Sequence, residues 1–171
     1  LSEEGLFDAS YKKPLPAYPM DIALVTGNNT AAREDALITL KKRWPISKLT
    51  EYPAPVQGMD AAPKIITALQ AADAGNHQVI MLVRGGGSIE DLWCFNDETL
   101  ARYIFQMKTP IVTGIGHEID FTLVDFVSDS RANTPTGAVE AAVPDMQEVL
   151  ATLQNSRSRL MNAMRNTTFV S

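Results

Sequence analysis

The segment Arg84-Gly85-Gly86-Gly87-Ser88 combines a cation with a glycine run, a pairing suited to phosphate groups. Glycine places no side chain between backbone and ligand, and it adopts positive φ values that other residues avoid. Successive amide N–H groups in such a turn can form an anion-binding nest, and the planar guanidinium of Arg84 suits bidentate contact with phosphate oxygens. We predict that Arg84, the three glycines and Ser88 bind phosphate. The competing interpretation is a tight strand-to-helix turn with a surface arginine.

The segment Gly116-His117-Glu118-Ile119-Asp120 brings one histidine and two carboxylates together. The imidazole of His117 titrates near neutral pH, so it can act as a general acid or base. Asp120 would orient the imidazole or its reaction partner. The same side chains could instead ligate a metal ion; we predict no metal site and no required cofactor, while leaving a divalent metal open. In the alternative structural interpretation, Asp120 caps the helix that follows.

Other positions are candidates for a role at the same site. Asp35 falls in the second turn of a predicted helix, where its carboxylate can point back over the sheet edge. Arg131 supplies a second local cation for phosphate groups. Trp93 and Phe95 fit either the core or a wall on which bases stack, and we favour the core. Cys94 has no base beside it in the sequence, so we predict no nucleophilic role for it.

Hydrophobic periodicity places these segments at the ends of predicted strands. Short apolar runs predict strands over residues 21–27, 47–52, 77–85 and 110–116. Between and after them, helical spacing predicts helices over residues 30–43, 60–74, 96–107 and 121–128, followed by a turn over 131–137. This alternation favours an open α/β fold with a mainly parallel sheet of about four strands and flanking helices. Three loops that leave carboxyl ends of strands should therefore converge at one edge of the sheet, namely 27–30, 84–88 and 114–120.

The chain from residue 138 onward is predicted to be helical, with Pro144 interrupting or starting the helix. Six side chains recur at alternating intervals of four and three, namely Met146, Leu150, Leu153, Arg157, Leu160 and Met164. Such spacing is typical of a coiled-coil seam. An amphipathic helix packed on the domain fits the pattern equally well.

Composition narrows the class of protein. The 171 residues include 20 Asp+Glu and 15 Lys+Arg, which gives a formal net charge of −5, and one cysteine. This length suits one domain with its own core, and a lone thiol excludes an internal disulfide. No apolar stretch reaches the length of a membrane span, so we expect no membrane contact and a cytoplasmic location. An acidic chain is not expected to bind a nucleic acid through its overall charge, whereas a phosphate-binding site needs only local cations such as Arg84.

Three segments carry a resemblance to a known family: YPAPVQG (52–58), VRGGGSIEDLWCFND (83–97) and PIVTGIGHEIDFTLVDFVSDSRANTPTGAVEAAVPD (110–145). They resemble the large subunit of exodeoxyribonuclease VII, and the similarity extends over almost the whole chain. The resemblance implies an exonuclease that hydrolyses single-stranded DNA to oligonucleotides and nucleoside 5′-phosphates without an added divalent metal. It also implies that the family's essential residues fall on Asp35, Arg84, His117 and Asp120.

The resemblance also implies a division of the chain. Residues 1–19, which begin without a methionine, are expected to lead in from a missing N-terminal domain. Residues 20–145 would form the catalytic α/β domain, and residues 146–171 the start of a helical arm that binds the small subunits of exodeoxyribonuclease VII. Because the strand-gripping domain of the family would be missing, we expect the chain alone to be weakly active or inactive.

In the mechanism that we expect, Arg84 and the amides of residues 85–88 stabilise the charge of the transition state. His117 acts as base or acid, Asp120 orients it, and Asp35 either activates water or positions one of these groups. An alternative from another class is a nucleotide-binding or phosphosugar-binding α/β domain without nuclease activity. A third interpretation is a structural α/β domain whose C-terminal helix mediates assembly.

Overall fold

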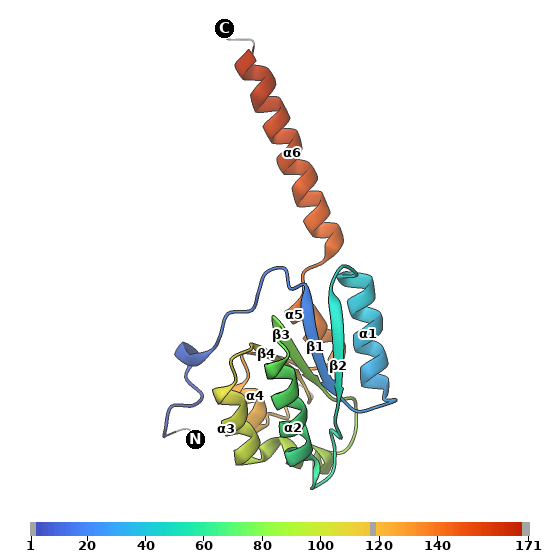
Figure 1. The fold of residues 1–171 in the computed structure, drawn as a ribbon, viewed down its shortest axis with the longest axis vertical. Coiled ribbons are helices and arrows are strands. Elements are labelled where there is room, and N and C mark those ends of the chain that lie inside the picture. The colour runs from blue at the N-terminus through green and yellow to red at the C-terminus, as the bar shows by residue number, and fades with distance from the viewer. Residues whose placement is uncertain (1–2, 117–118, 169–171) are drawn as a thin grey trace.

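A five-stranded parallel sheet forms the centre of the molecule, in the order β2-β1-β3-β4-β5. The computed structural model describes residues 3–116 and 119–168, and Figure 1 shows how its sheet and helices are arranged. The strands are β1 (Asp21–Thr26), β2 (Lys48–Pro53), β3 (Val79–Val83), β4 (Ile111–Gly114) and β5 (Ser130–Ala132). Every neighbouring pair is parallel. The predicted open α/β fold is therefore confirmed.

The fifth strand and the helix after it correct the prediction of a turn over residues 131–137. Residues Ser130 to Ala132 pair with β4, and helix α5 (Pro135–Ala142) begins soon afterwards. A three-residue strand is too short for a period-two pattern to reveal it. The hydroxyl of Thr134 accepts a hydrogen bond from the Gly137 amide. The threonine is therefore an N-cap and the proline after it a first-turn residue, both typical of a helix start.

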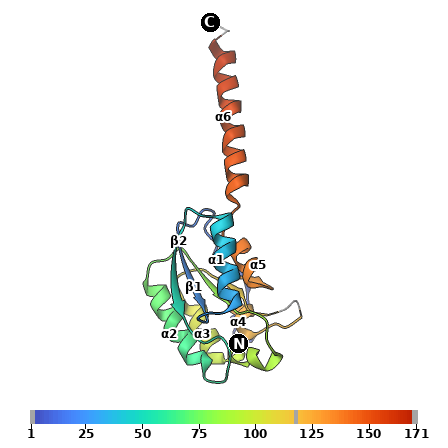
Figure 2. The same ribbon diagram turned by 90° about the vertical axis from the view of Figure 1, so that its right-hand side faces the viewer.

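Helices cover both faces of the sheet, as the side view in Figure 2 shows. Helices α1 (Ala31–Arg43) and α5 pack on one face. The other face is covered by α2 (Ala61–Ala74), α3 (Glu98–Gln106), α4 (Leu123–Val127) and the 3₁₀ helix η2 (Ile89–Asn96). All five residues of β3 are buried, which explains the continuous apolar run of this strand, because both of its faces are covered.

Residues 3–20, which include the 3₁₀ helix η1 (Ala9–Tyr11), lie against the body of the molecule. The Lys12 ammonium donates to the backbone oxygens of Phe126, at 2.8 Å, and Ser128. Burial lowers the pKa of Lys12, because desolvation disfavours the charged ammonium. Further along, the indole of Trp44 donates to the backbone oxygen of Pro19 at 2.7 Å. This lead-in segment is thus tied both to α4 and to the end of α1.

Helix α6 (Met146–Thr168) follows Pro144 and projects away from the sheet, as Figure 1 shows. The side chains of Met146 and Val149, at its root, pack against the core. Further along, Leu153 and Leu160 are 60% and 62% exposed. The interpretation as an amphipathic helix packed on the domain is therefore wrong. No helix within residues 3–116 and 119–168 is long and apolar enough to cross a membrane.

Candidate phosphate-binding and active site

The carboxyl ends of the strands bring the three predicted loops to one edge of the sheet. In the strand order 2-1-3-4-5, the winding reverses between β1 and β3, and open α/β sheets bind ligands at such a switch point. The Thr26 hydroxyl at the end of β1 donates to the Val83 carbonyl at 2.8 Å. The Arg84 amide after β3 donates to the Gly114 carbonyl at 3.0 Å. These bonds join the starts of the loops, so the predicted convergence is confirmed.

Glycine is needed in the loop after β3 for close packing rather than for a positive φ. Of the described glycines, Gly5 and Gly58 have positive φ, so the expected left-handed backbone in residues 85–87 is wrong. A β-carbon on Gly87 would instead lie 2.3 Å from Nη2 of Arg84. The missing side chain makes room for the guanidinium, which folds back over its own loop.

The Arg84 side chain is 5% exposed and is held inside the loop. Its Nη2 donates to the Ser88 carbonyl at 3.2 Å and lies 3.5 Å from Oδ2 of Asp91. Its Nε is buried and has no hydrogen-bond partner among the described residues. A buried donor without a partner lowers the stability of a protein by about 1–3 kcal/mol. A functional role is one reason why a protein retains such a group. An oxyanion that reached Nε would remove this cost.

The amides of the glycine loop are available only in part. The Ser88 amide donates to Oδ2 of Asp91 at 3.2 Å, and the Asp91 amide donates back to the Ser88 carbonyl at 3.1 Å. The first bond caps the start of η2 with the Asp91 carboxylate, and the second is a backbone bond of the helical turn itself. The amide of Ser88, one of those predicted to bind phosphate, is therefore already bound to a carboxylate. The spacing of Asp91 from Ser88 is that of a capping box, which is typical of a helix start.

Asp35 lies on the exposed side of α1, near the end of the helix that faces the glycine loop. One turn earlier, Ala32 packs on this loop, since a β-carbon on Gly85 would lie 3.4 Å from that of Ala32. Residues three apart are neighbours on a helix surface. The fold thus brings Asp35 to the rim of the loop, and no hydrogen bond or ion pair among the described residues joins it to Arg84.

The segment after β4 folds back beside η2. A β-carbon on Gly116 would lie 2.8 Å from the Asp120 carbonyl and 3.8 Å from Leu92 of η2. Asp120 is half-buried. Its contact with Gly116 brings it near η2, the helix that carries Asp91. His117 and Glu118 lie outside the described residues, and their roles stay predictions. Within the part of the chain that is described, no three His, Cys, Asp or Glu side chains are placed to hold a metal ion.

Helix α4 is capped by Thr122, whose hydroxyl accepts from the Asp125 amide. The alternative interpretation of Asp120 as this cap is therefore wrong. The carboxylate of Asp125 is fully buried and lies 3.6 Å from Nε of Arg131. It also accepts from the hydroxyl of Thr113 at 2.9 Å and from the amide of Thr122 at 3.1 Å. Asp125 thus positions Arg131 at the candidate site, and its capping-box spacing from Thr122 was the signal that sequence reasoning overlooked.

An aromatic row leads from the lead-in segment to Arg131. The Phe7 and Phe126 ring centroids are 5.2 Å apart, and those of Phe126 and Phe121 are 5.5 Å apart. The guanidinium carbon of Arg131 lies 3.9 Å from the centroid of the Phe121 ring, a favourable cation–π arrangement. The row of Phe7, Phe126 and Phe121 thus connects the lead-in segment with the Arg131 guanidinium.

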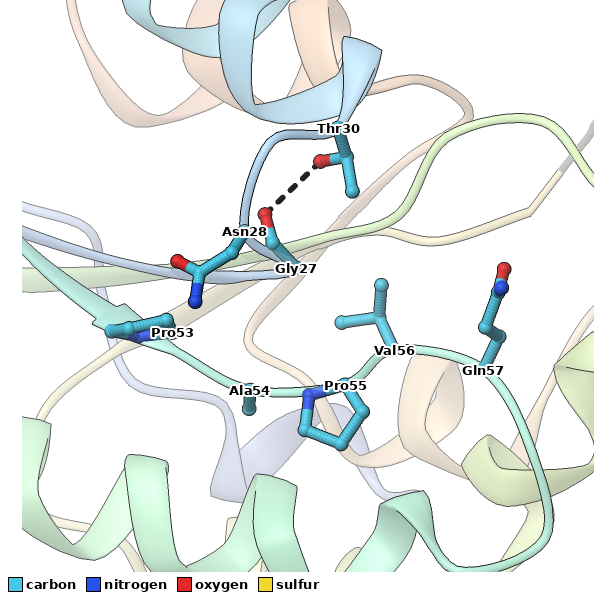
Figure 3. Close-up of a pocket in the computed structure, with 8 residues that line it drawn as sticks. All are labelled: Gly27, Asn28, Thr30, Pro53, Ala54, Pro55, Val56 and Gln57. Atoms are coloured by element: carbon cyan, nitrogen blue, oxygen red, sulfur yellow. Dashed lines mark hydrogen bonds between the residues drawn. The ribbon is translucent and has the colours of Figure 1, made fainter.

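A cavity of about 400 Å³ opens at the ends of β1 and β2, beside the start of α1. Figure 3 shows its lining, in which the hydroxyl of Thr30 donates to the Gly27 carbonyl at 3.1 Å. Asn28 adds an amide side chain, and Ala54 and Val56 form a buried apolar side. Its volume lies within the range of small-ligand pockets. Loop 27–30 was predicted at this edge, whereas the contribution of the loop after β2 was not.

Helix η2 exposes one aromatic side chain and buries another. Phe95 is fully buried, as the sequence predicts, whereas Trp93 is 67% exposed, so the prediction that Trp93 belongs to the core is wrong. Cys94 is buried, and this burial raises its pKa to about 11 although the nearby charge of Arg84 acts in the opposite direction. A thiol with this pKa stays protonated at neutral pH, which agrees with the prediction of no nucleophilic role.

Comparison with known proteins identifies relatives over nearly the whole chain. A family model described as "Exonuclease VII, large subunit" matches residues 6–169. The chain is 53% identical over 165 residues to the exodeoxyribonuclease 7 large subunit of Nitrosomonas eutropha, which covers 96% of the chain and 37% of that relative. It is 48% identical over 166 residues to the protein of the same name from Geobacillus kaustophilus, with the same two coverages of 96% and 37%. The chain thus spans little more than a third of the length of these curated relatives.

Proposed function

The chain belongs to the exonuclease VII large-subunit family, and on that premise we propose that it hydrolyses phosphodiester bonds of single-stranded DNA. The products would be oligonucleotides and nucleoside 5′-phosphates. One observation carries the proposal, namely the buried guanidinium of Arg84 at the carboxyl edge of the sheet, whose Nε has no hydrogen-bond partner within residues 3–116 and 119–168. A phosphate oxygen is the ligand that best completes such a group.

In the proposed reaction, Arg84 and the amides of residues 85–87 stabilise the charge that develops on the phosphoryl oxygens. Water attacks phosphorus, and the bond to the leaving oxygen breaks. His117 moves the proton between them, and Asp120 orients His117. Asp35, at the rim of the glycine loop, activates the water or positions one of these groups. Arg131 binds a further phosphate, and neither a metal ion nor another cofactor takes part.

We also propose that α6 begins an arm for the small subunits of the same enzyme, and that the protein works in the cytoplasm. The exposed side chains of Leu150, Leu153 and Leu160 support the arm, because apolar positions in a seam of threes and fours pack against a partner helix. A buried free thiol, Cys94, is compatible with a reducing compartment.

Single substitutions test the proposal: Asp35→Asn, Arg84→Ala, His117→Ala and Asp120→Asn. Each variant is assayed on end-labelled single-stranded DNA, with and without a chelator, in this chain and at the matching positions of a full-length relative. Arg102→Ala is the matched control, because this half-buried arginine of α3 pairs with Glu4 of the lead-in segment and Glu98 of its own helix, and none of these residues belongs to the glycine loop. We expect each site variant to lose at least about 100-fold in rate, and the control to keep its rate.

Near-normal cleavage by Arg84→Ala or His117→Ala would overturn the proposed site. Loss of wild-type activity in chelator would overturn the metal-independent reaction and favour a metal bound by His117, Glu118 and Asp120. Binding of mononucleotides without any cleavage, in the full-length relative as well, would favour a nucleotide-binding domain instead.

A further inference from the structure

We propose that Trp93 is a stacking platform for one nucleobase of bound single-stranded DNA, beside the glycine loop that binds the adjoining phosphate. The proposal rests on the proposed function, and it adds a base-binding group to a site whose other groups contact phosphate. It assigns a role to Trp93, a large aromatic side chain that is not buried in the core.

The exposure of Trp93 is not a result of loose structure around it. Its neighbours Leu92, Cys94 and Phe95 are all buried, between 0% and 6% exposed, whereas the Trp93 side chain is 67% exposed. The other tryptophan of the chain, Trp44, is 2% exposed and donates its indole N–H to the Pro19 carbonyl. A well-packed helix therefore presents one indole ring to solvent, at a considerable cost in apolar exposure.

The same helix holds the phosphate-binding cation. Asp91, two residues before Trp93, binds the Ser88 amide and lies 3.5 Å from the Arg84 guanidinium. These contacts fix the start of η2 to the glycine loop. Because a 3₁₀ helix advances about 2 Å per residue, the backbone positions of Asp91 and Trp93 lie only about 4 Å apart along the helix axis. The carboxylate that contacts Arg84 and the proposed aromatic platform are thus carried by one helix.

Trp93 also faces the second segment of the candidate site. In a 3₁₀ helix, side chains three apart lie above one another, so Trp93 shares a face with Asn96. The side-chain oxygen of Asn96 accepts from the Leu123 amide at 3.0 Å, at the end of the segment that carries Asp120. The neighbouring Phe121 is 52% exposed. The helix that carries Trp93 is thus bonded at its start to the glycine loop and at its end to the segment after β4.

The chemistry of this position selects unpaired bases. Every base has a π face that can stack on an indole, so such a platform binds single strands without regard to sequence. In a duplex, each base is already stacked and paired, and extruding one costs energy. A phosphate on Arg84 and a base on Trp93 would together favour single-stranded DNA over the duplex.

Tryptophan fluorescence tests the proposal directly, because Trp93 is exposed and Trp44 is buried. Wild type, Trp93→Phe and Trp93→Ala are titrated with a short oligothymidylate and with an abasic strand of equal length. Phosphorothioate linkages protect both ligands from cleavage, and anisotropy of a label on the DNA reports affinity. Tyr11→Ala is the matched control, since Tyr11 is also exposed, at 60%, but lies on the lead-in segment.

We expect oligothymidylate, and not the abasic strand, to quench the wild-type emission. Trp93→Phe should lose this quenching and keep most of the affinity. Trp93→Ala should bind oligothymidylate about tenfold more weakly, which corresponds to about 1.4 kcal/mol, with no change for the abasic strand. Tyr11→Ala should bind both ligands as the wild type does.

Wild-type affinity in Trp93→Ala, or equal quenching by the abasic strand, would overturn the stacking role while leaving the proposed nuclease function intact. A change of oligomeric state in Trp93→Ala, measured by light scattering, would also overturn it and assign Trp93 to a protein interface. Failure of the wild type to bind either strand would overturn both proposals for this chain.

Discussion

Gly87→Ala is expected to disable the candidate site by moving Arg84 while leaving the fold intact. The added β-carbon would lie 2.3 Å from Nη2 of Arg84 and 2.9 Å from Oδ2 of Asp91. Ordinary contact begins at 3.4 Å, so Nη2 must retreat by about 1.1 Å, the difference between 3.4 and 2.3 Å. Both displaced atoms end flexible side chains, so the backbone need not move. A misplacement of about 1 Å at a reacting group can cost about 100-fold in rate.

The assay compares kcat/KM for end-labelled single-stranded DNA with thermal unfolding of the same variants. Gly86→Ala adds the same methyl group where nothing lies within 4 Å, so it measures the effect of stiffening the loop alone. We expect Gly87→Ala to lose about 100-fold with a Tm close to wild type, and Gly86→Ala to stay at least about tenfold more active than Gly87→Ala. In an Arg84→Ala background, Gly87→Ala should cost nothing further.

Wild-type kcat/KM in Gly87→Ala would refute the reasoning. So would a loss in Gly87→Ala that is repeated in full on top of Arg84→Ala, because the methyl group would then act on something other than the guanidinium. A large fall in Tm would show that the loop backbone, and not the side chain, gives way.

Three further predictions concern groups around the site. Burial raises the pKa of Cys94 from 9.0 to about 11, so the thiol ionises at a lower pH in the unfolded chain than in the folded one. The free energy of unfolding should therefore fall as the pH rises from 9 toward 11. Chemical unfolding at several pH values measures this free energy, and a value that does not change with pH would contradict the prediction. Gly114→Ala puts a β-carbon 2.6 Å from the Thr134 carbonyl, a backbone atom that cannot yield cheaply, so urea unfolding should show a loss of about 1–3 kcal/mol, and an unchanged midpoint would speak against this contact. Lys12→Met removes the donor to the carbonyl of Phe126, so chymotrypsin should cleave the lead-in segment faster than in wild type, and equal rates would mean that other contacts hold it.

Sequence periodicity predicted the elements that are long or fully buried. Helix α1 begins after the Thr30 cap and ends at Arg43 as expected, because a cap, apolar spacing and terminal cations all agree there. The strand β3 was evident from its apolar run. The strand β5 and the helix η2 were not predicted, because three strand residues and a 3₁₀ period leave too little pattern.

The groups of the site were predicted by type, but their surroundings were not. The prediction that Arg84 binds phosphate follows from its chemistry, whereas its folding back onto Asp91 depends on packing that the sequence does not reveal. The exposure of Trp93 depends likewise on which side of η2 faces the core. Asp125 was overlooked because a capping carboxylate and a buried partner of Arg131 look the same in a sequence.

Helix α6 and the candidate site lie at opposite edges of the sheet. Its root lies beside Met20 and Ile46, which precede β1 and β2, at the amino edge of the sheet. At 1.5 Å per residue, its 23 residues extend about 35 Å, and in Figure 1 they point away from the body of the molecule. A partner bound along α6 would therefore lie beyond the amino edge of the sheet. It would leave the approach to Arg84, at the carboxyl edge, unobstructed.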